Sequence, residues 1–305
     1  MSIRLIRIGH QQIEVNGQQL LRQLAAFSAA ILEKLLKAFF QLRIRPILFF
    51  RKRERHGEAK RSGLDAICLT EHFNTAQFDE LYGYIASKGE QVGDAFAFGG
   101  LKVFPGMETD IAEGGHVICV GKMDAVRELN RRLEPHKEKG KFLPAGELFD
   151  LFDEYHLLVG AGHPFRDGGH IPELDEGMLK RFDFIDLNGK DIAIDRRRTE
   201  RLTYGFGRKL GKPVVSGSDT HQAVQYGCVR TLFERPFDTV EDMEKEIKAG
   251  NYRIVINPEA GFKVKTADLL KRSLKEIHAL GGDYVSVLLR KSGESPAVLA
   301  AKGAN

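Results

Sequence analysis

Acidic and imidazole side chains follow short apolar runs at several points in this chain. The clearest case is Asp219 and His221, which lie two residues apart directly after the apolar run 213–215. Residues with this spacing on an extended segment project from the same side. A carboxylate and an imidazole together suit one divalent transition metal ion. The spacing therefore indicates a metal site at the carboxyl end of a buried strand.

Four further fragments of this kind occur upstream, most of them directly after an apolar run. Any one of them has an ordinary alternative, such as an exposed loop acid or a histidine that merely begins a strand. Together the five fragments predict a multinuclear metal site at the mouth of a barrel. The candidate donors that they add are Glu71, His72, Glu108, His116 and His163.

Three other residues are candidates for contact with an anionic substrate. Arg166, three residues after His163, has a planar guanidinium that suits a phosphate, with a solvated loop arginine as the alternative. His170 lies in the same glycine-rich loop, and Asn188 ends the apolar run 184–187. The arginines at 196–198 are interpreted as a solvated helix face.

Short apolar runs alternate with amphipathic segments from residue 57 onward. This alternation predicts a parallel sheet, and donors at the strand ends favour a closed barrel with a site at its carboxyl face. The predicted strands are 66–69, 102–104, 116–120, 157–160, 184–187, 213–216 and 252–256. The predicted helices are 77–88, one within 124–139, 196–210, 239–248 and 267–280.

Charge is distributed unevenly along the 305 residues, whose net charge is +4. Residues 1–62 carry 13 Lys and Arg against 4 Asp and Glu, whereas the remainder is net acidic. The cysteines Cys68, Cys119 and Cys228 follow no metal or disulfide spacing. Buried thiols at the first two predict a reducing, cytoplasmic location. No uncharged apolar run reaches the length of a transmembrane helix, and the signal-peptide pattern is missing.

The segments 63–72, 104–108, 162–164 and 217–221 resemble those of the PHP (polymerase and histidinol phosphatase) family of metal-dependent phosphoesterases. The resemblance spans roughly residues 57 to 235. It implies an α/β fold, a distorted TIM-like (β/α)7 barrel with the metal site at the carboxyl ends of the strands. The implied organisation is an atypical basic and apolar leader (1–55), a barrel core (56–235), a PHP-associated segment packing on the barrel (236–291) and a flexible tail (292–305).

The resemblance also implies a histidinol-phosphatase-like activity. A phosphate ester of a small metabolite or nucleotide would be cleaved by water activated by two to three Mn, Zn or Fe ions. Nucleic acid is a disfavoured substrate, because the barrel portion is net acidic and shows no basic stripe with interleaved aromatics. The implied metal ligands are Glu71, His72, Glu108, His116, His163, Asp219 and His221, with Glu108 bridging and with Glu108, His163 and His221 as catalytic residues.

Two departures from the family weaken the expectation of activity. The family's first strand ends in His-x-His, but only His10 and His56 precede His72, and neither has a histidine two residues away. Glu71 stands where the family usually has Asp, so its ion would sit differently. A degenerate protein that binds metal or phosphate without turnover is the alternative, and an exonuclease-type phosphodiesterase is the third.

Three interpretations of residues 1–55 stay open. The apolar stretch 24–50 with its interspersed charges is typical of an amphipathic membrane or partner helix. Residues 47–50, just after Pro46, could replace the first barrel strand. A frame-shifted or mis-started translation is the third, because the family pattern resumes abruptly near residue 56. Reading the gene upstream of Gly57 in the other two frames for His-x-His tests that idea.

Overall fold

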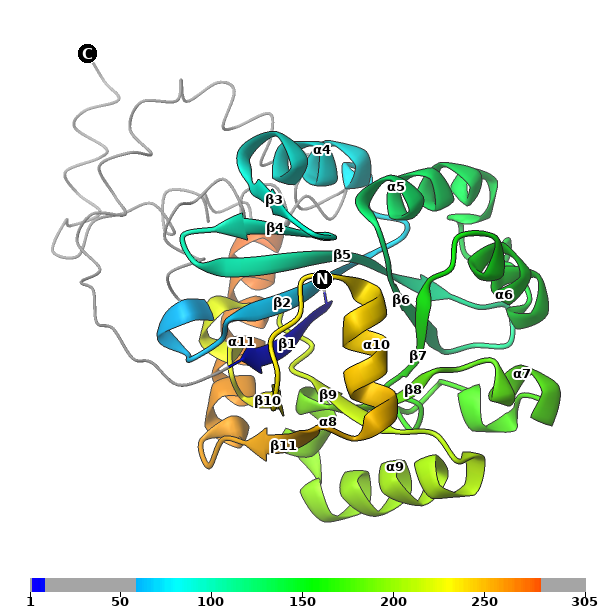
Figure 1. Ribbon diagram of the computed structural model, residues 1–305. Coiled ribbons are helices and arrows are strands. Elements are labelled where there is room, and N and C mark those ends of the chain that lie inside the picture. The colour runs from blue at the N-terminus through cyan, green and yellow to red at the C-terminus, as the bar shows by residue number, and fades with distance from the viewer. Residues whose placement is uncertain (1, 9–58, 281–305) are drawn as a thin grey trace, which may run out of the picture.

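A curled sheet wrapped by helices organises the computed structural model, which describes residues 2–8 and 59–280 (Figure 1). Its eleven strands run in the order β11-β10-β1-β2-β5-β6-β7-β8-β9, and β4 pairs with both β3 and β5. The strands are β1 (Ser2–Ile8), β2 (Ala66–His72), β3 (Glu90–Val92), β4 (Ala95–Phe98), β5 (Leu101–Asp110), β6 (His116–Val120), β7 (Leu158–Gly162), β8 (Phe184–Asn188), β9 (Val214–Gly217), β10 (Val229–Phe233) and β11 (Tyr252–Ile256). The α-helices are α4 (Phe78–Lys88), α5 (Met123–Arg132), α6 (Ala145–Glu154), α7 (Glu176–Lys180), α8 (Gly189–Ile194), α9 (Arg196–Leu210), α10 (Val240–Ala249) and α11 (Ala260–Ala279), with short 3-10 turns η2 (Glu134–His136), η3 (Ile171–Glu173) and η4 (Ala223–Gln225).

Strand directions make this sheet mixed rather than parallel. β2 pairs in parallel with β5, and β8 with β7 and β9, but β6 is antiparallel to both of its neighbours. The prediction of a parallel sheet is wrong at β6, because a short turn without a crossover helix joins it to β5. The sheet still curls, so that the backbone N–H of Ser216 on β9 donates to Thr231 Oγ1 on β10 at 3.0 Å. The fold is therefore α/β, with the curvature of a TIM-like half-barrel.

The strand next to β2 comes from the start of the chain. β1 pairs antiparallel with β2 and parallel with β10, and contains no histidine. Residues 47–50, the sequence-based candidate for this place, lie outside the described residues. Apart from β1, the other residues of the leader (1–55) and the predicted tail (292–305) also lie outside the described residues.

Apolar side chains fill one end of the curled sheet. Phe104 on β5 and Phe184 on β8 share a buried cluster with Met243 and Ile247 of α10. Figure 1 shows α10 lying across this end. Because alternate residues of a strand face the same way, Glu108 and Asp110 face the same side of β5 as Phe104. α10 therefore closes the end opposite to these polar side chains.

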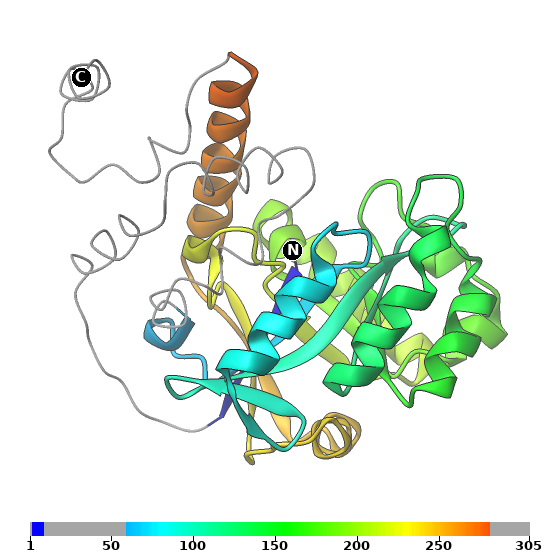
Figure 2. The same ribbon diagram turned by 90° about the horizontal axis from the view of Figure 1, so that it is seen from above.

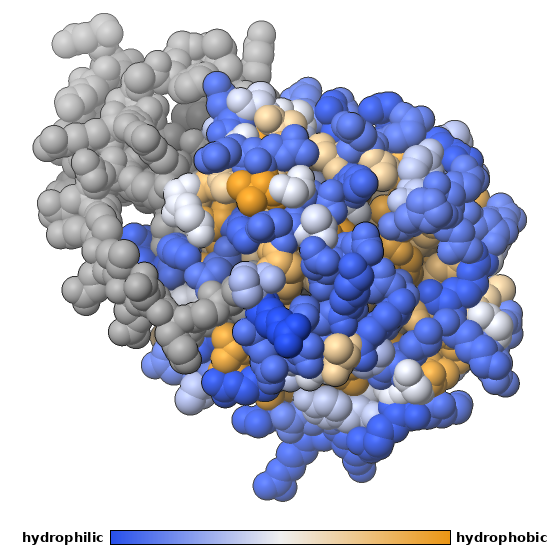
Figure 3. Space-filling model, in the orientation of Figure 1, coloured by the Kyte–Doolittle hydropathy of each residue, from blue (hydrophilic) through white to orange (hydrophobic). Residues whose placement is uncertain are grey.

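The outer face of the sheet packs beneath helices. Ile67 and Leu69 of β2 belong to a larger buried cluster with Leu81 and Ile85 of α4. Helices α4, α5, α6, α7 and α9 lie around the outside of the sheet (Figures 1 and 2). The described surface in the first view is mainly hydrophilic (Figure 3). Of the helices within 59–280, none is long and apolar enough to span a bilayer.

Several predicted elements agree closely with the structure. β6 and α9 have the predicted bounds, and α9 begins where the Asp195 side chain accepts a hydrogen bond from the backbone N–H of Arg198 at 2.9 Å. The prediction of buried thiols at Cys68 and Cys119 is confirmed. β3 and β4 were not predicted, because strands of three or four residues carry too little periodicity to stand out.

Candidate metal centre

Strand ends bring the candidate donors to one end of the curled sheet, here called the polar rim. β2, β5, β7, β8 and β9 all run toward this end. β6 runs the other way, so its first residue also lies there. The rim residues at or just after these strand ends are His72, Asp110, His116, His163, Asn188 and Asp219.

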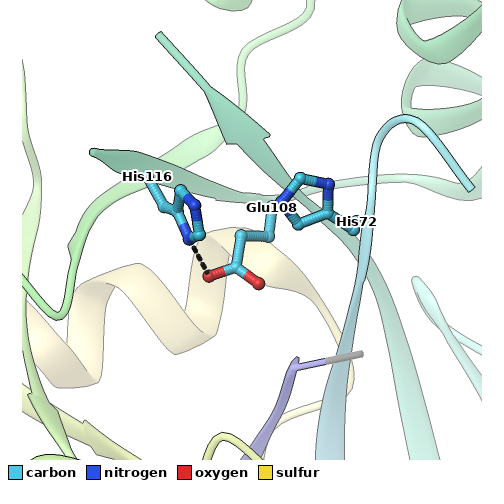
Figure 4. Close-up of side chains that lie close together, drawn as sticks. All are labelled: His72, Glu108 and His116. Carbon is cyan, nitrogen blue, oxygen red and sulfur yellow. Dashed lines mark hydrogen bonds and ion pairs between the residues drawn. The ribbon is translucent and has the colours of Figure 1, made fainter. Parts of the chain in front are cut away.

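His72, Glu108 and His116 converge from three neighbouring strands (Figure 4). The register pairs His72 with Glu108 across β2 and β5, and Asp110 with His116 across β5 and β6. One ligand atom from each of the three converging side chains lies within 4.8 Å of the others. Two imidazoles and a carboxylate are donors that Mn, Zn and Fe accept. This donor set therefore fits a divalent transition metal ion.

His163 extends the cluster from the end of β7. Its Nε2 lies 3.1 Å from Glu108 Oε1 and 2.9 Å from His116 Nδ1. The residue before a proline is usually extended, but His163, which precedes Pro164, has a φ of 32° in the left-handed region. The His163 backbone N–H donates to Asp186 Oδ2 at 3.1 Å. Such a bond helps to hold a residue in a sparsely populated conformation.

Asp110 is a rim residue that the sequence analysis missed. Its Oδ1 lies 2.8 Å from His116 Nε2, and its Oδ2 lies 3.5 Å from His72 Nε2. A carboxylate between two imidazoles can orient both rings or bind an ion itself. Asp110 follows Glu108 by two residues on a strand, so the period of two could have placed both on one face.

Glu108 and His116 form a charged pair near neutral pH. Burial raises the pKa of Glu108, but His116 and His163 outweigh burial and hold it well below its ordinary value. Burial lowers the pKa of His116, but Glu108 and Asp110 outweigh it and raise the pKa to about 10. An ion that binds the His116 ring must therefore displace a proton.

Asp219, His221 and Arg166 form a second group at the rim. Arg166 Nη2 lies 2.9 Å from Asp219 Oδ2, and Arg166 Nε lies 2.9 Å from Asp191 Oδ1. Burial raises the pKa of Asp219, but His221 and Arg166 outweigh it and lower the pKa. Burial also lowers the pKa of His221 to about 3. At pH 7 His221 is neutral, so Arg166 is the cation that balances Asp219.

The neutral ring of His221 has a nitrogen suited to a metal ion. Its Nδ1 lies 2.9 Å from the Asp219 carbonyl oxygen, so Nδ1 donates and Nε2 keeps its lone pair. Gln225 Oε1 accepts the His221 backbone N–H at 2.7 Å and fixes this loop. Metal ligation by Asp219 and His221 stays a prediction, because the cluster of His72, Glu108 and His116 does not include them.

The three predicted substrate residues have different surroundings. Asn188 is buried, and its Oδ1 accepts from Arg166 Nη2 at 2.8 Å and from the first backbone N–H groups of α8. Arg166 is thus held from three sides, by Asn188, Asp191 and Asp219. His170 instead pairs with Glu173 on the exposed surface, with Nδ1 and Oε2 3.0 Å apart. Asn188 consequently positions Arg166, and His170 has no contact with the metal cluster among the described residues.

Glu71 lies apart from the other predicted ligands. It alternates with His72 on β2, and so it faces the helix-covered side together with Ile67 and Leu69. Its Oε1 accepts from Thr75 Oγ1 at 2.8 Å, and burial raises its pKa. Metal ligation by Glu71 stays a prediction, and the cluster of His72, Glu108 and His116 does not include it.

A cavity of about 600 Å³ adjoins the rim. Asp110, His116, His163 and Arg166 form the part of its wall that belongs to the two groups described above. The rest comes from loops near residues 111–115, 139–142 and 167–169. This volume is in the range of small-molecule sites, so a ligand in the cavity would meet the candidate donors directly.

Comparison with known proteins agrees with this architecture. A family model described as PHP-associated matches residues 201–252, which confirms the resemblance to the PHP family. No curated protein matches the chain significantly.

Two solved structures resemble the fold. PsfC from Pseudomonas syringae PB-5123 aligns with a TM-score of 0.59 and 21% identity, covering 72% of this chain and 89% of that one. Endonuclease Q, bound to a 27-mer duplex with an abasic lesion at its active site, aligns with a TM-score of 0.50 and 18% identity. That alignment covers 65% of this chain and 52% of endonuclease Q, so this chain spans about half the length of that protein.

Proposed function

We propose that this chain, which resembles the PHP family, is a metal-dependent phosphoesterase that hydrolyses the phosphate ester of a small metabolite or nucleotide. One observation carries the proposal. The 600 Å³ cavity is lined jointly by His116 and His163 of the metal cluster and by the cationic Arg166. A phosphoryl group in that cavity would meet metal ligands and a guanidinium together.

We propose that two ions of Mn, Zn or Fe bind at the rim, in a distorted barrel of the PHP type. His72, Glu108, His116 and His163 would hold one, and Asp219 and His221 would contribute to the other. Glu108 would bridge the two, as the resemblance to the PHP family implies. When bound, such ions activate water and neutralise phosphoryl charge.

The protein's own residues would bind and orient the substrate. Arg166 brings a fixed positive charge to the cavity wall, and Asn188 and Asp191 hold its plane in position. His221 is a poor proton donor for the leaving group at neutral pH, because its pKa is about 3. A ligand role for His221 is therefore favoured over an acid role. We also propose a cytoplasmic location, which the three buried free cysteines support.

A metal- or phosphate-binding protein without turnover is the second candidate. The observation that favours it is β1, which lies between β10 and β2 and contains no histidine. Nuclease activity is the third candidate. The net acidic charge of residues 63–305 opposes binding of a phosphate-rich polymer.

Metal loading and turnover, measured together, test the proposal. Protein purified without chelator or histidine tag would be loaded with Mn²⁺ or Zn²⁺, analysed for metal content, and assayed for phosphate release from a panel of phosphomonoesters. Release that depends on bound metal supports the phosphoesterase. Stoichiometric metal without any release supports the second candidate and overturns the first.

A further inference from the structure

We infer that Lys139 determines substrate specificity by binding an anionic group on the leaving part of the substrate, remote from the ester that is cleaved. This inference rests on the proposed phosphoesterase function. Lys139 lines the same cavity as Asp110, His116 and Arg166, but it belongs to a separate loop between η2 and α6. A ligand anchored at the rim therefore extends toward this loop.

Among residues 2–8 and 59–280, no ion pair engages the ammonium of Lys139, so it can meet a ligand. Arg166 is engaged by Asp219 and Asp191, and His116 is engaged by Glu108 and Asp110. Among the described residues that line the cavity, Lys139 is the cation that forms no ion pair.

The neighbouring lysines show a different pattern. Lys137 pairs with Glu134 at 2.6 Å, and Lys141 pairs with Glu138 at 2.7 Å. Neither of them lines the cavity. In this basic loop, the lysine that has no carboxylate partner in the described part of the chain is thus the one that lines the cavity.

The loop that carries Lys139 is tied to the rim at both ends. The Lys137 carbonyl oxygen accepts from Asn74 Nδ2 at 3.4 Å, and Asn74 Oδ1 lies 2.9 Å from His72 Nδ1. At the other end, the Ala112 backbone N–H donates to the Leu143 carbonyl oxygen at 2.9 Å. The backbone on both sides of Lys139 is therefore held beside the rim, which reduces the ordering cost of binding.

The rest of the cavity wall indicates the substrate class. Phe142 lines the cavity, braced by an edge contact with Phe73 at 5.7 Å between ring centroids. An apolar or aromatic spacer would pack there, between an ester at Arg166 and an anion at Lys139. Asp167 lines the cavity from the loop after β7 and would repel that anion. The class is a phosphomonoester whose leaving group carries a carboxylate or a second phosphate.

A matched pair of substrates tests Lys139. Steady-state kinetics of metal-loaded protein would compare phenyl phosphate with its para-carboxylated analogue, and para-phenylene bisphosphate would distinguish a second phosphate from a carboxylate. We expect the carboxylated ester to have the lower KM, and Lys139→Gln to raise its KM roughly two- to fivefold more than that of phenyl phosphate, as for an exposed ion pair. The turnover rate at saturation should change little in this variant. Asp167→Asn should lower the KM of the carboxylated ester relative to that of phenyl phosphate, because it removes a charge that repels the carboxylate.

Lys141→Gln is the control, because this lysine lies two residues away, pairs with Glu138 and does not line the cavity. Its kinetics should match the wild type for each ester. If Lys139→Gln and the wild type both hydrolyse the esters with the same ratio of KM values between the carboxylated ester and phenyl phosphate, the inference about Lys139 is overturned but the proposed function is not. Failure of the wild type to hydrolyse any ester would overturn the proposed function as well.

Discussion

Glu108 is the side chain at which the two groups of the candidate centre meet. It is 5% exposed, contacts His116 and His163, and acts electrostatically on Asp219. His116 pairs with Glu108 on one side, and Arg166 pairs with Asp219 on the other. Because these carboxylates lie at the rim and outside the apolar core, loss of one of them should disturb function before it disturbs the fold.

Asp219→Asn tests this balance directly. The amide keeps the shape of the side chain but removes the charge that pairs with Arg166. We expect phosphoester turnover to fall by about 100-fold or more, as when a single charge-stabilising group is removed, with thermal unfolding still cooperative. The control is Glu173→Gln, an exposed acid that pairs only with His170 in the described residues. Undiminished turnover in Asp219→Asn would rule out the assigned site.

The charged pair of Glu108 and His116 predicts a pH-dependent stability of the metal-free protein. The pKa of His116 rises from its ordinary 6.5 to about 10 on folding. Its contribution to stability is therefore complete below pH 6.5 and is lost as the pH rises toward 10. Chemical denaturation at several pH values should show the free-energy difference between wild type and His116→Asn shrinking over that interval.

Two further comparisons make the pH experiment decisive. His170→Asn changes a surface histidine outside the cluster and serves as the control. Bound metal should remove the pH dependence, because the ion replaces the proton on His116. If the difference in unfolding free energy between wild type and His116→Asn stays constant from pH 6 to 10, His116 is not held as a cation in the folded protein.

At the scale of elements, β5 carries the centre and is confined closely by its two neighbours. A methyl group added at Gly106 would lie 2.5 Å from the Cys119 carbonyl oxygen on β6 and 2.9 Å from Thr70 Cγ2 on β2. Both are far inside ordinary contact, and one belongs to the backbone. The close approach of these strands is what brings His72, Glu108 and His116 within reach of one ion.

Gly106→Ala should therefore destabilise the fold by about 1–3 kcal/mol, as overpacking of a core does. The matched substitution Gly205→Ala places the same methyl group on α9, where nothing lies within 4 Å. It should stabilise by about 0.4–1 kcal/mol, because alanine reduces the freedom of the unfolded chain. Urea denaturation measures both variants. Equal changes in the free energy of unfolding for the two variants would contradict the close packing of β5 against β2 and β6.

At the scale of the whole molecule, the rim is built by strands that are far apart in sequence, and α10 closes the opposite end. The described first strand, β1, contributes no imidazole to this assembly. We therefore expect at most two transition metal ions per chain by elemental analysis. Three equivalents would mean that donors outside the described residues complete a further site.

Removal of the ions should lower the melting temperature and restoring them should raise it again. An ion that binds only the folded state stabilises it by about 2.7 kcal/mol when present at 100 times its Kd. Differential scanning calorimetry with and without chelator measures the shift. A melting temperature that does not respond, in protein shown to have lost its metal, would contradict a metal-organised rim.

The sequence predicted the outline of the site, because chain order, strand ends and side-chain type are local properties. His72, Glu108, His116 and His163 do meet at one end of the sheet. It missed Asp110, whose only signal was the spacing from Glu108. Glu71 faces the opposite side of β2 from its neighbour His72, so its role as a ligand stays a prediction.

By itself, the sequence determined most of the candidate donors and most of the elements, since apolar runs and the polar residues that follow them are local features of the chain. Only the tertiary structure decided the direction of β6, the strand beside β2 and the pKa shifts of Glu108, His116, Asp219 and His221. Strand pairing is non-local, and pKa values depend on burial and on charges brought close by folding. The same holds for Lys139, whose role depends on a cavity that no local pattern encodes.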